Sequence, residues 1–183
     1  MTFILPLARS LTMALGIALC QSPFATAGEI VDEVRFGAGG VIEGDGSKDK
    51  GAVGSLELYF APFGSSETGL AGVLTQPRIE LGVSGGADAT DQVYAGLNWH
   101  LPLGETFFAE AGFGGTVHNG NLDGGDGPRL GCRLLFREQV ALGMHITDRV
   151  NLVASADHSS HANICDGPND GLTHAGLALG VKF

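Results

Sequence analysis

Apolar residues alternate with polar or small residues along most of the chain, and this period of two limits the fold more than any other feature. In VYAGLNWHL (93–101) every odd-numbered residue is apolar, and in VALGMHI (140–146) every even-numbered one is. Successive side chains of a β-strand point to opposite faces, so the pattern predicts strands with one apolar face each. The chain is therefore expected to be all-β.

The alternation recurs often enough to predict eight antiparallel strands. They are expected near residues 33–42, 50–61, 76–86, 91–101, 105–117, 130–146, 149–160 and 173–183. The sixth is expected to be the longest, with a bend or bulge around Arg137 and Glu138. Most have the roughly nine to eleven residues with which a tilted strand crosses a bilayer.

Composition narrows the fold class further. The chain has 30 glycines and is 44% hydrophobic, yet beyond its first residues it lacks the run of about 20 apolar residues that a spanning helix needs. An eight-stranded antiparallel transmembrane β-barrel fits, because it spreads its apolar residues over alternate positions. The alternatives are a periplasmic β-sandwich and a soluble lipocalin-like carrier, whose apolar faces point inward.

The first residues have the composition of an export signal. Arg9 precedes an apolar run over 11–19, and Ala25-Thr26-Ala27 provides a small-residue cleavage site. We expect a signal peptide over 1–27 and one barrel domain over 28–183. Without Arg9 the domain is more acidic than the whole chain, which carries a net charge of −10, and this argues against nucleic acid as a partner.

The polar faces and the connections favour the outer membrane of a Gram-negative bacterium. Short links at 102–105 and 147–148 are expected at one end of the barrel, and long polar links at 118–129 and 161–172 at the other; 62–75 is an exception. The polar faces hold charges of both signs, which are expected to neutralise one another in the lumen. These residues are Arg35, Glu57, Arg78, Glu80, Glu110 and Lys182.

Residues suited to nucleophilic catalysis share the apolar face of the seventh strand. In VNLVASADHSSH (150–161), His158 and Ser160 are two positions apart, so both side chains stand on one face about 7 Å apart at the backbone. His158 is placed to act as a general base and Ser160 as a nucleophile. A solvated loop edge that happens to contain both residues is the simpler alternative. A nucleophile on a lipid-facing side suits a lipid substrate.

Several segments carry a family resemblance. HSSHANICDGPNDGLTHAGLALGVKF (158–183), together with VYAGLNW, GGTVHNG and LGCRLLFRE, resembles the PagL-type lipid A 3-O-deacylases, or acyloxyacyl hydrolase-like proteins. The resemblance implies an eight-stranded outer-membrane barrel that removes the acyl chain esterified at position 3 of lipid A. It also implies a serine, a histidine and an acid as catalytic residues, without a metal or another cofactor. The family's His-x-Ser falls on His158 and Ser160.

The chain departs from the family pattern at two positions. His161 occupies the position of the asparagine that serves the oxyanion, and Thr173 occupies the position of the acid. Asp166 and Asp170, in the adjoining loop, are alternative acids, whereas His174 points to the other face by parity. A non-catalytic structural or lipopolysaccharide-binding barrel that has lost part of the triad is therefore the alternative function.

The remaining expectations concern partners and loops. Lipid A or lipopolysaccharide and the outer membrane are the expected partners, and whether the protein forms a homodimer stays open. Cys132 and Cys165 are expected at the same end of the barrel, either as a disulfide or as two free thiols. The acidic, glycine-rich 118–129 segment is expected to be a loop rather than a calcium site.

Overall fold

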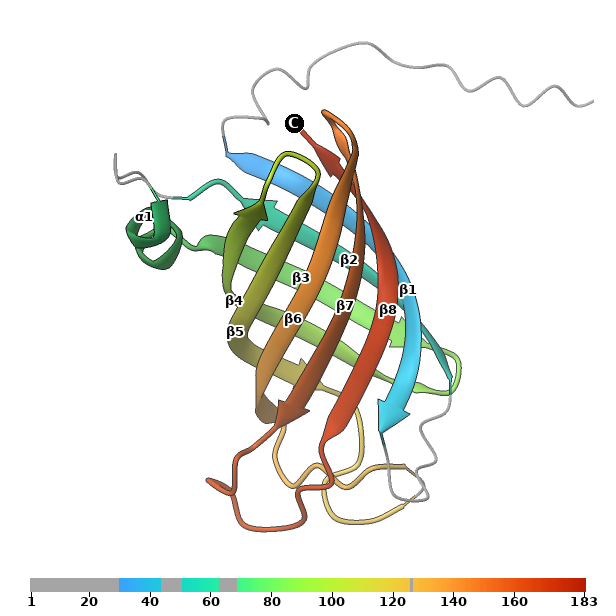
Figure 1. The fold of residues 1–183 in the computed structure, drawn as a ribbon. Coiled ribbons are helices and arrows are strands. Elements are labelled where there is room, and N and C mark those ends of the chain that lie inside the picture. The colour runs from blue at the N-terminus through green and yellow to red at the C-terminus, as the bar shows by residue number, and fades with distance from the viewer. Residues whose placement is uncertain (1–29, 44–50, 63–68, 126) are drawn as a thin grey trace, which may run out of the picture.

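The computed structural model describes residues 30–43, 51–62, 69–125 and 127–183, so the expected signal peptide lies outside the described residues. Eight antiparallel strands and one short helix follow one another along the chain (Figure 1). They are β1 (Val31–Glu43), β2 (Ala52–Phe60), α1 (Gly69–Thr75), β3 (Arg78–Gly86), β4 (Ala89–Leu103), β5 (Phe107–His118), β6 (Leu134–Thr147), β7 (Val150–Ser160) and β8 (Leu172–Lys182).

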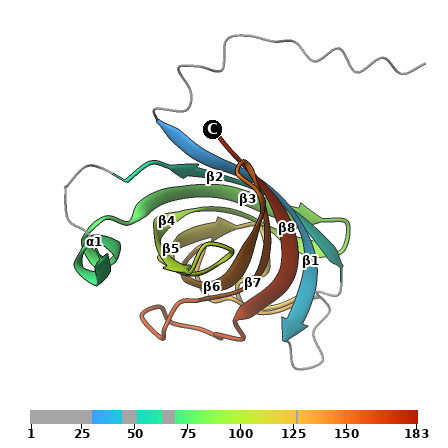
Figure 2. The same cartoon turned by 45° about the horizontal axis from the view of Figure 1, so that its top comes forward.

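Each strand pairs with its neighbours in sequence, and β1 also pairs with β8, so the sheet closes into a barrel (Figures 1 and 2). Closure leaves no strand edge, and every strand has a hydrogen-bonded neighbour on both sides. A sheet in hydrocarbon needs this arrangement, because no water is present there to bind exposed amide and carbonyl groups. The prediction of an eight-stranded antiparallel barrel is confirmed, and the β-sandwich alternative is wrong.

The apolar faces of the strands point outward. Along β6 the odd-numbered residues from 135 to 143 are buried, and the even-numbered residues from 134 to 142 are exposed. The other strands also expose their apolar residues. The exposed large side chains include Phe36, Val93, Phe113, Val140, Leu142 and Leu177. Polar side chains fill the inside instead. This is the arrangement of a barrel surrounded by lipid, and it contradicts the soluble-carrier alternative.

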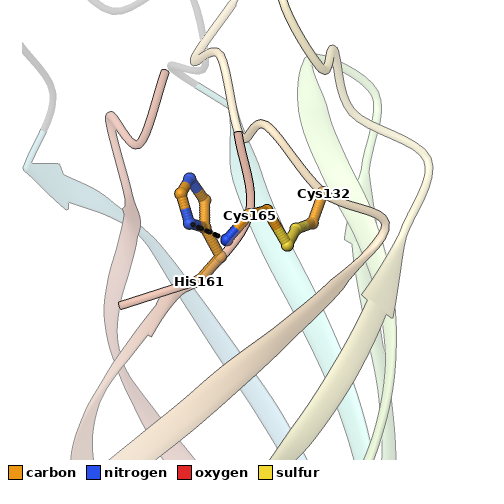
Figure 3. Close-up of side chains that lie close together, drawn as sticks. All are labelled: Cys132, His161 and Cys165. Atoms are coloured by element: carbon orange, nitrogen blue, oxygen red, sulfur yellow. Dashed lines mark hydrogen bonds between the residues drawn. A yellow bond between two sulfur atoms is a disulfide. The ribbon is translucent and has the colours of Figure 1, made fainter. Parts of the chain in front are cut away.

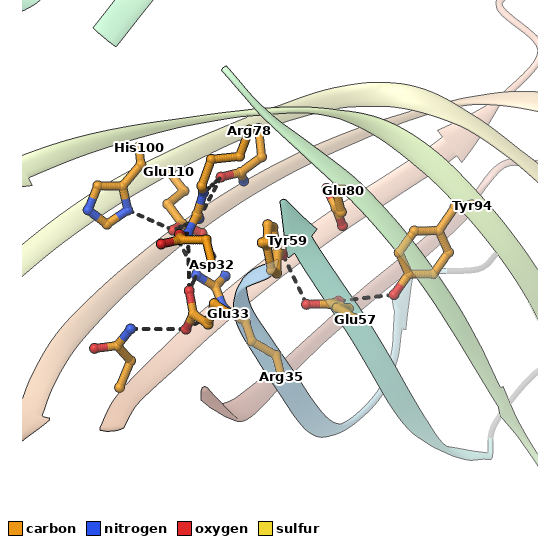
Figure 4. A network of polar contacts seen from close by, with 12 residues as sticks. Asp32, Glu33, Arg35, Glu57, Tyr59, Arg78, Glu80, Tyr94, His100 and Glu110 are labelled. Atoms are coloured by element: carbon orange, nitrogen blue, oxygen red, sulfur yellow. Dashed lines mark hydrogen bonds and ion pairs between the residues drawn. The ribbon is translucent and has the colours of Figure 1, made fainter. Parts of the chain in front are cut away.

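A network of charged side chains fills part of the lumen (Figure 4). Arg35 donates to Glu33 and Glu110 over 2.7–3.0 Å, and all three side chains are almost completely buried. Arg78 donates to the same two carboxylates and to Asp32. Each buried charge therefore faces opposite charges and has hydrogen bonds, as a dry lumen requires. The expected neutralisation inside the barrel is confirmed for Arg35, Arg78 and Glu110.

Aromatic rings pack beside the charged network and account for some of the glycines. The Tyr59 ring lies 4.2 Å from the Arg35 guanidinium carbon. Phe108 is fully buried and faces Gly143 directly across the β5–β6 ladder, where any larger side chain would collide with the ring. Tyr94 lies over Gly82 in the same way. A glycine beside a large inward ring keeps the narrow lumen filled without overpacking.

The two ends of the barrel differ. One end has the short links 104–106 and 148–149 and the carboxyl terminus, and we name it the turn end. The other has the long segments 119–133 and 161–171, and we name it the loop end. Outer-membrane barrels have short turns on the periplasmic side and longer loops outside, so the loop end corresponds to the external side.

The long link between β2 and β3 contains α1, which lies outside the barrel wall beside β4 (Figures 1 and 2). The indole nitrogen of Trp99 donates a hydrogen bond to the carbonyl oxygen of Leu74 over 3.1 Å and ties this helix to the wall. Among the described residues, no helix has the length and hydropathy needed to cross a membrane.

Two details of the sixth strand differ from the prediction. It begins at Leu134 rather than near residue 130, and β4, with 15 residues, is longer. The register is continuous through Arg137 and Glu138, so the expected bulge there is wrong. Residues 130–133, including Cys132, belong instead to the preceding loop, where Leu130 is buried against Leu135 and Leu172.

The lumen network makes a testable contribution to stability. Glu110→Gln removes the carboxylate shared by Arg35 and Arg78 and leaves excess positive charge in a buried site. We expect the free energy of unfolding to fall by about 3 kcal/mol. Urea titration of the barrel refolded in lipid vesicles measures it through the fluorescence of Trp99, the single tryptophan. Glu105→Gln, in an exposed turn, is the charge-matched control. Equal midpoints for the two variants would contradict the prediction.

Candidate active site

His158 and Ser160 stand on the outward face of β7 at the loop end. Ser160 is the last residue of the strand, and both side chains are half-buried. Their apolar neighbours are Phe113 and Phe136, whose rings stack with centroids 6.0 Å apart. The period of two along β7 therefore carries an imidazole and a hydroxyl onto the side that faces lipid, as the sequence predicts.

The two residues line a groove of about 220 Å³ in the outer surface of the barrel. Phe113 and Phe136 form its apolar part, and Glu138 and Ala162 complete it. A groove with apolar walls and a few polar groups resembles a binding site for an amphipathic ligand. Its volume suits a segment of an acyl chain rather than a whole lipid.

The imidazole of His158 is held from β8. Its Nδ1 lies 2.9 Å from the hydroxyl oxygen of Thr173, which is its direct partner in the β7–β8 ladder. With the proton on Nδ1, the ring donates to this oxygen and leaves Nε2 free to accept a proton. The position of the family's acid is therefore in contact with the histidine, although its side chain is neutral.

Gly171 makes room for the ring. Its φ of +72° is in the left-handed region, and a Cβ there would lie 2.7 Å from Cε1 of His158 and 3.4 Å from Nε2. The Cε1–Nε2 edge of the ring therefore lies beside Gly171, the residue before the β8 residue that pairs with Ser159. Among the hydrogen bonds of the described residues, none joins the Ser160 hydroxyl to His158. Such contacts often form only when substrate binds.

His161 lies apart from this groove. Its side chain is buried, and its ring organises the loop that follows β7 (Figure 3). Nδ1 accepts a hydrogen bond from the amide of Cys165 at 3.4 Å, and Nε2 donates to the carbonyl oxygen of Pro168 at 3.2 Å. The backbone amide of His161 donates to the side-chain oxygen of Asn169. The structure brings Ser160, His158 and Thr173 to one face and places the His161 ring elsewhere.

A disulfide joins the two long segments of the loop end. Cys132 and Cys165 are bonded, with their Cα atoms 6.2 Å apart (Figure 3). The sequence left open whether these cysteines form a disulfide or remain free thiols, and the structure shows the disulfide. Cys132, Cys165 and His161 are close enough to share a metal ion, but the disulfide engages both sulfur atoms and the His161 nitrogens bind the loop.

An ion pair ties the same segments together. Arg129 donates from its side chain and its backbone amide to Asp170 over 2.9–3.1 Å, and the Asp170 amide donates back to the Arg129 carbonyl oxygen. These hydrogen bonds hold the pKa of Asp170 below its ordinary value, because they stabilise the carboxylate. Asp170, one of the two alternative acids, is therefore engaged by Arg129.

Sequence reasoning did not assign Glu138, the acidic residue of the groove, to the site. Glu138 is exposed on the outward face of β6 and is the direct ladder partner of His158. Parity alone places Glu138 on the outward side, between Phe136 and Val140. Its position opposite His158 depends on the β6–β7 register, which the sequence did not specify.

Solved structures similar to this one define the fold class. The crystal structure of the outer membrane enzyme PagL matches with a TM-score of 0.63 and 18% identity, covering 82% of this chain and 99% of that one. The crystal structure of Neisserial surface protein A matches with a TM-score of 0.51 and 9% identity, covering 84% and 96%. A de novo designed transmembrane β-barrel gives 0.52 and 6%, covering 85% and 96%. The chain is an eight-stranded transmembrane β-barrel of the outer-membrane type.

Comparison of the sequence with family models identifies a more specific similarity than the structural matches do. The family model for lipid A 3-O-deacylase (PagL) matches residues 94–182, from within β4 to the end of β8. This segment contains the whole groove and both loop-end segments. A search of curated proteins found no match. The resemblance to PagL-type lipid A deacylases, expected from the sequence, is confirmed.

The disulfide is expected to protect the loop end. Replacing both Cys132 and Cys165 by serine removes the covalent link between the segments while the barrel wall keeps its hydrogen bonds. Opening of a loop closed by a disulfide typically becomes easier by about 2–4 kcal/mol when the link is removed. Limited proteolysis of intact membranes should show faster cleavage within 161–171, with heat-modifiable migration of the barrel unchanged. Equal cleavage rates would show that the Arg129–Asp170 pair suffices.

Proposed function

We propose that the protein is an outer-membrane serine esterase that removes the acyl chain esterified at position 3 of lipid A. One observation carries the proposal. His158 and Ser160 lie on the lipid-facing side of the barrel in an apolar groove at its external end, and Thr173 orients the imidazole. The family-model match over this segment supports the same activity.

The proposed reaction uses only side chains of this chain. Ser160 attacks the carbonyl carbon of the ester while its proton passes to Nε2 of His158, and the tetrahedral intermediate forms. The intermediate then releases the sugar hydroxyl, which takes the proton from His158, and an acyl-serine remains. Water, activated by the same imidazole, hydrolyses the acyl-serine and regenerates the hydroxyl.

The position of the groove supports a membrane lipid as substrate. Lipid A occupies the outer leaflet, and its ester bonds lie below the sugar headgroup, at the depth where chain and headgroup meet. A nucleophile on the outer wall at the loop end meets such an ester without the lipid leaving the membrane. The apolar rings of Phe113 and Phe136 then contact the acyl segment next to the ester.

His161 is proposed to act indirectly. It occupies the position of the family's oxyanion asparagine, but its ring contacts Pro168 and Cys165. It precedes Ala162 and Asn163, both in the left-handed region with φ of 47° and 59°. We assign it the role of holding this strained turn beside the nucleophile.

The proposal extends to export and assembly. Residues 1–27 would direct the chain out of the cytoplasm of a Gram-negative bacterium, and residues 28–183 would insert as one barrel. Lipid A or lipopolysaccharide would be its partner in the membrane. A homodimer remains a separate proposal that crosslinking in intact membranes would test.

The neutral side chain of Thr173 is the reason to consider a second, non-catalytic function. In the described structure no carboxylate makes a hydrogen bond or ion pair with His158, and the acid position holds a neutral hydroxyl. A barrel that binds lipopolysaccharide without cleaving it would tolerate this change. The two functions differ in their effect on the acyl pattern of lipid A.

Mass spectrometry of lipid A tests the proposed activity. Cells that express the protein are expected to lose one ester-linked acyl chain per lipid A, and Ser160→Ala should abolish the loss. Removal of a serine nucleophile or its histidine lowers kcat by as much as about 10⁶-fold. Ser159→Ala is the matched control, because that neighbouring hydroxyl points into the lumen toward Gln92. An unchanged acyl pattern with correctly inserted protein would favour the non-catalytic barrel.

Replacement of Thr173 is expected to slow catalysis through the orientation of His158. Thr173→Val keeps the shape of the side chain but removes the oxygen that holds Nδ1 of His158. We expect kcat to fall about 10- to 100-fold with little change in KM, because a less well-oriented base affects the transition state more than binding. Steady-state kinetics on lipid A in mixed micelles measures both constants. A parallel rise in KM would indicate that Thr173 contacts the substrate instead.

A further inference from the structure

Glu138 is the acidic residue on the outward faces of the three strands that form the active site. The outward side chains of β6, β7 and β8 are otherwise apolar, apart from His158, Ser160 and Thr173. We propose that Glu138 is a positioning residue whose negative charge stabilises the protonated form of His158 during catalysis. The proposal rests on the esterase function above and names a residue outside the family's triad positions.

The neighbours of Glu138 support this assignment. Across the β5–β6 ladder its direct partner is Phe113, and across the β6–β7 ladder it is His158. A carboxylate on the lipid-facing side of a barrel is unfavourable unless a partner or a function compensates for it. His158 is the polar residue among these two partners and can accept a positive charge.

The geometry fits an interaction through space. Directly opposed residues of neighbouring strands have Cβ atoms about 4.5–5.5 Å apart, and Glu138 and His158 line the same groove. Among the described residues no ion pair joins them, and Nδ1 of His158 is bound to Thr173. The low dielectric of the surrounding lipid strengthens charge interactions at such separations.

Two other carboxylates near β7, those of Asp157 and Asp170, are engaged elsewhere. Asp157 points into the lumen, 3.4 Å from Arg137 and 3.5 Å from His174. Asp170 is bound by Arg129 at the loop end. Glu138 is exposed and shares the groove with the base.

The two functions of a triad acid are thereby divided between two residues. Thr173 accepts the Nδ1 hydrogen bond and sets the orientation and tautomer of the ring. Glu138 supplies the negative charge that favours the imidazolium formed when the proton leaves Ser160. No proton is transferred to Glu138 in this scheme, as none is transferred to the acid of a serine triad.

Titration of His158 tests the charge interaction without any substrate. NMR of the full barrel in detergent micelles, with labelled histidine, measures the chemical shifts of the His158 ring as a function of pH. The His158→Asn variant identifies its signal among those of the six histidines. Outward groups that face the ring are Glu138 from β6 and the neutral Thr173 from β8. Glu138→Gln is expected to lower the midpoint, because it removes an anion that favours the charged ring. An unchanged midpoint would overturn the proposal.

Reactivity of Ser160 tests the consequence for catalysis. A fluorophosphonate probe labels activated serines, and Ser160→Ala defines the background. Glu138→Gln is expected to slow labelling and lower kcat on lipid A about 10- to 100-fold, with KM and unfolding midpoint unchanged. This is less than the roughly 10⁴-fold loss on replacing a hydrogen-bonded triad acid. Glu138→Asp, which keeps the charge, should recover part of the rate, and Glu105→Gln should match the wild type.

A rescue variant separates charge from structure. Thr173→Glu introduced into Glu138→Gln moves the carboxylate to the other side of the ring and is expected to restore labelling. If the wild type labels at Ser160 but leaves lipid A intact, the proposed substrate fails while a slower Glu138→Gln still supports the charge role. Equal labelling of the wild type and Glu138→Gln would overturn that role, whatever the substrate.

Discussion

The absence of water in hydrocarbon is the constraint on which the rest of the structure depends. Backbone amides and carbonyls in lipid must bind one another, so the sheet closes through the β1–β8 ladder. Closure sends alternate side chains into a narrow space that lipid does not reach. The charges of β1, β3 and β5 meet there, with Arg35 bound by Glu33 and Glu110, and outward positions are left to apolar residues.

This division makes the polar residues of the candidate active site exceptional. An imidazole, two hydroxyls and a carboxylate interrupt an apolar outer wall at the loop end, where the disulfide and the Arg129–Asp170 pair hold the adjoining segments. For the proposed esterase, the wall would place Ser160 at the depth of the ester bonds of its lipid substrate. In the same proposal, neighbours on β6 and β8 would stabilise the charged form of His158 during catalysis.

Much of the fold was predictable because a strand's period of two is local. The parity of His158 and Ser160, the inward direction of His174 and the neutralised lumen all follow from counting residues. The beginning of β6 was not predictable in this way. Residues 130–133 continue the apolar pattern but fold into the loop, where Leu130 packs against Leu135 and Leu172. Tertiary packing overrode the local pattern there.

By itself the sequence determined the all-β class, the separation of apolar and polar faces along each strand, and the presence of a histidine and a serine on the apolar face of one strand. These properties depend on alternation within single strands. The tertiary structure decided that the apolar faces point outward. It also decided which residues of different segments lie together: Thr173 with His158, Glu138 opposite His158 in the β6–β7 ladder, Cys132 with Cys165, and the His161 ring with its own loop. Register between strands and the path of the loops set those contacts, because backbone hydrogen bonds alone are compatible with several registers.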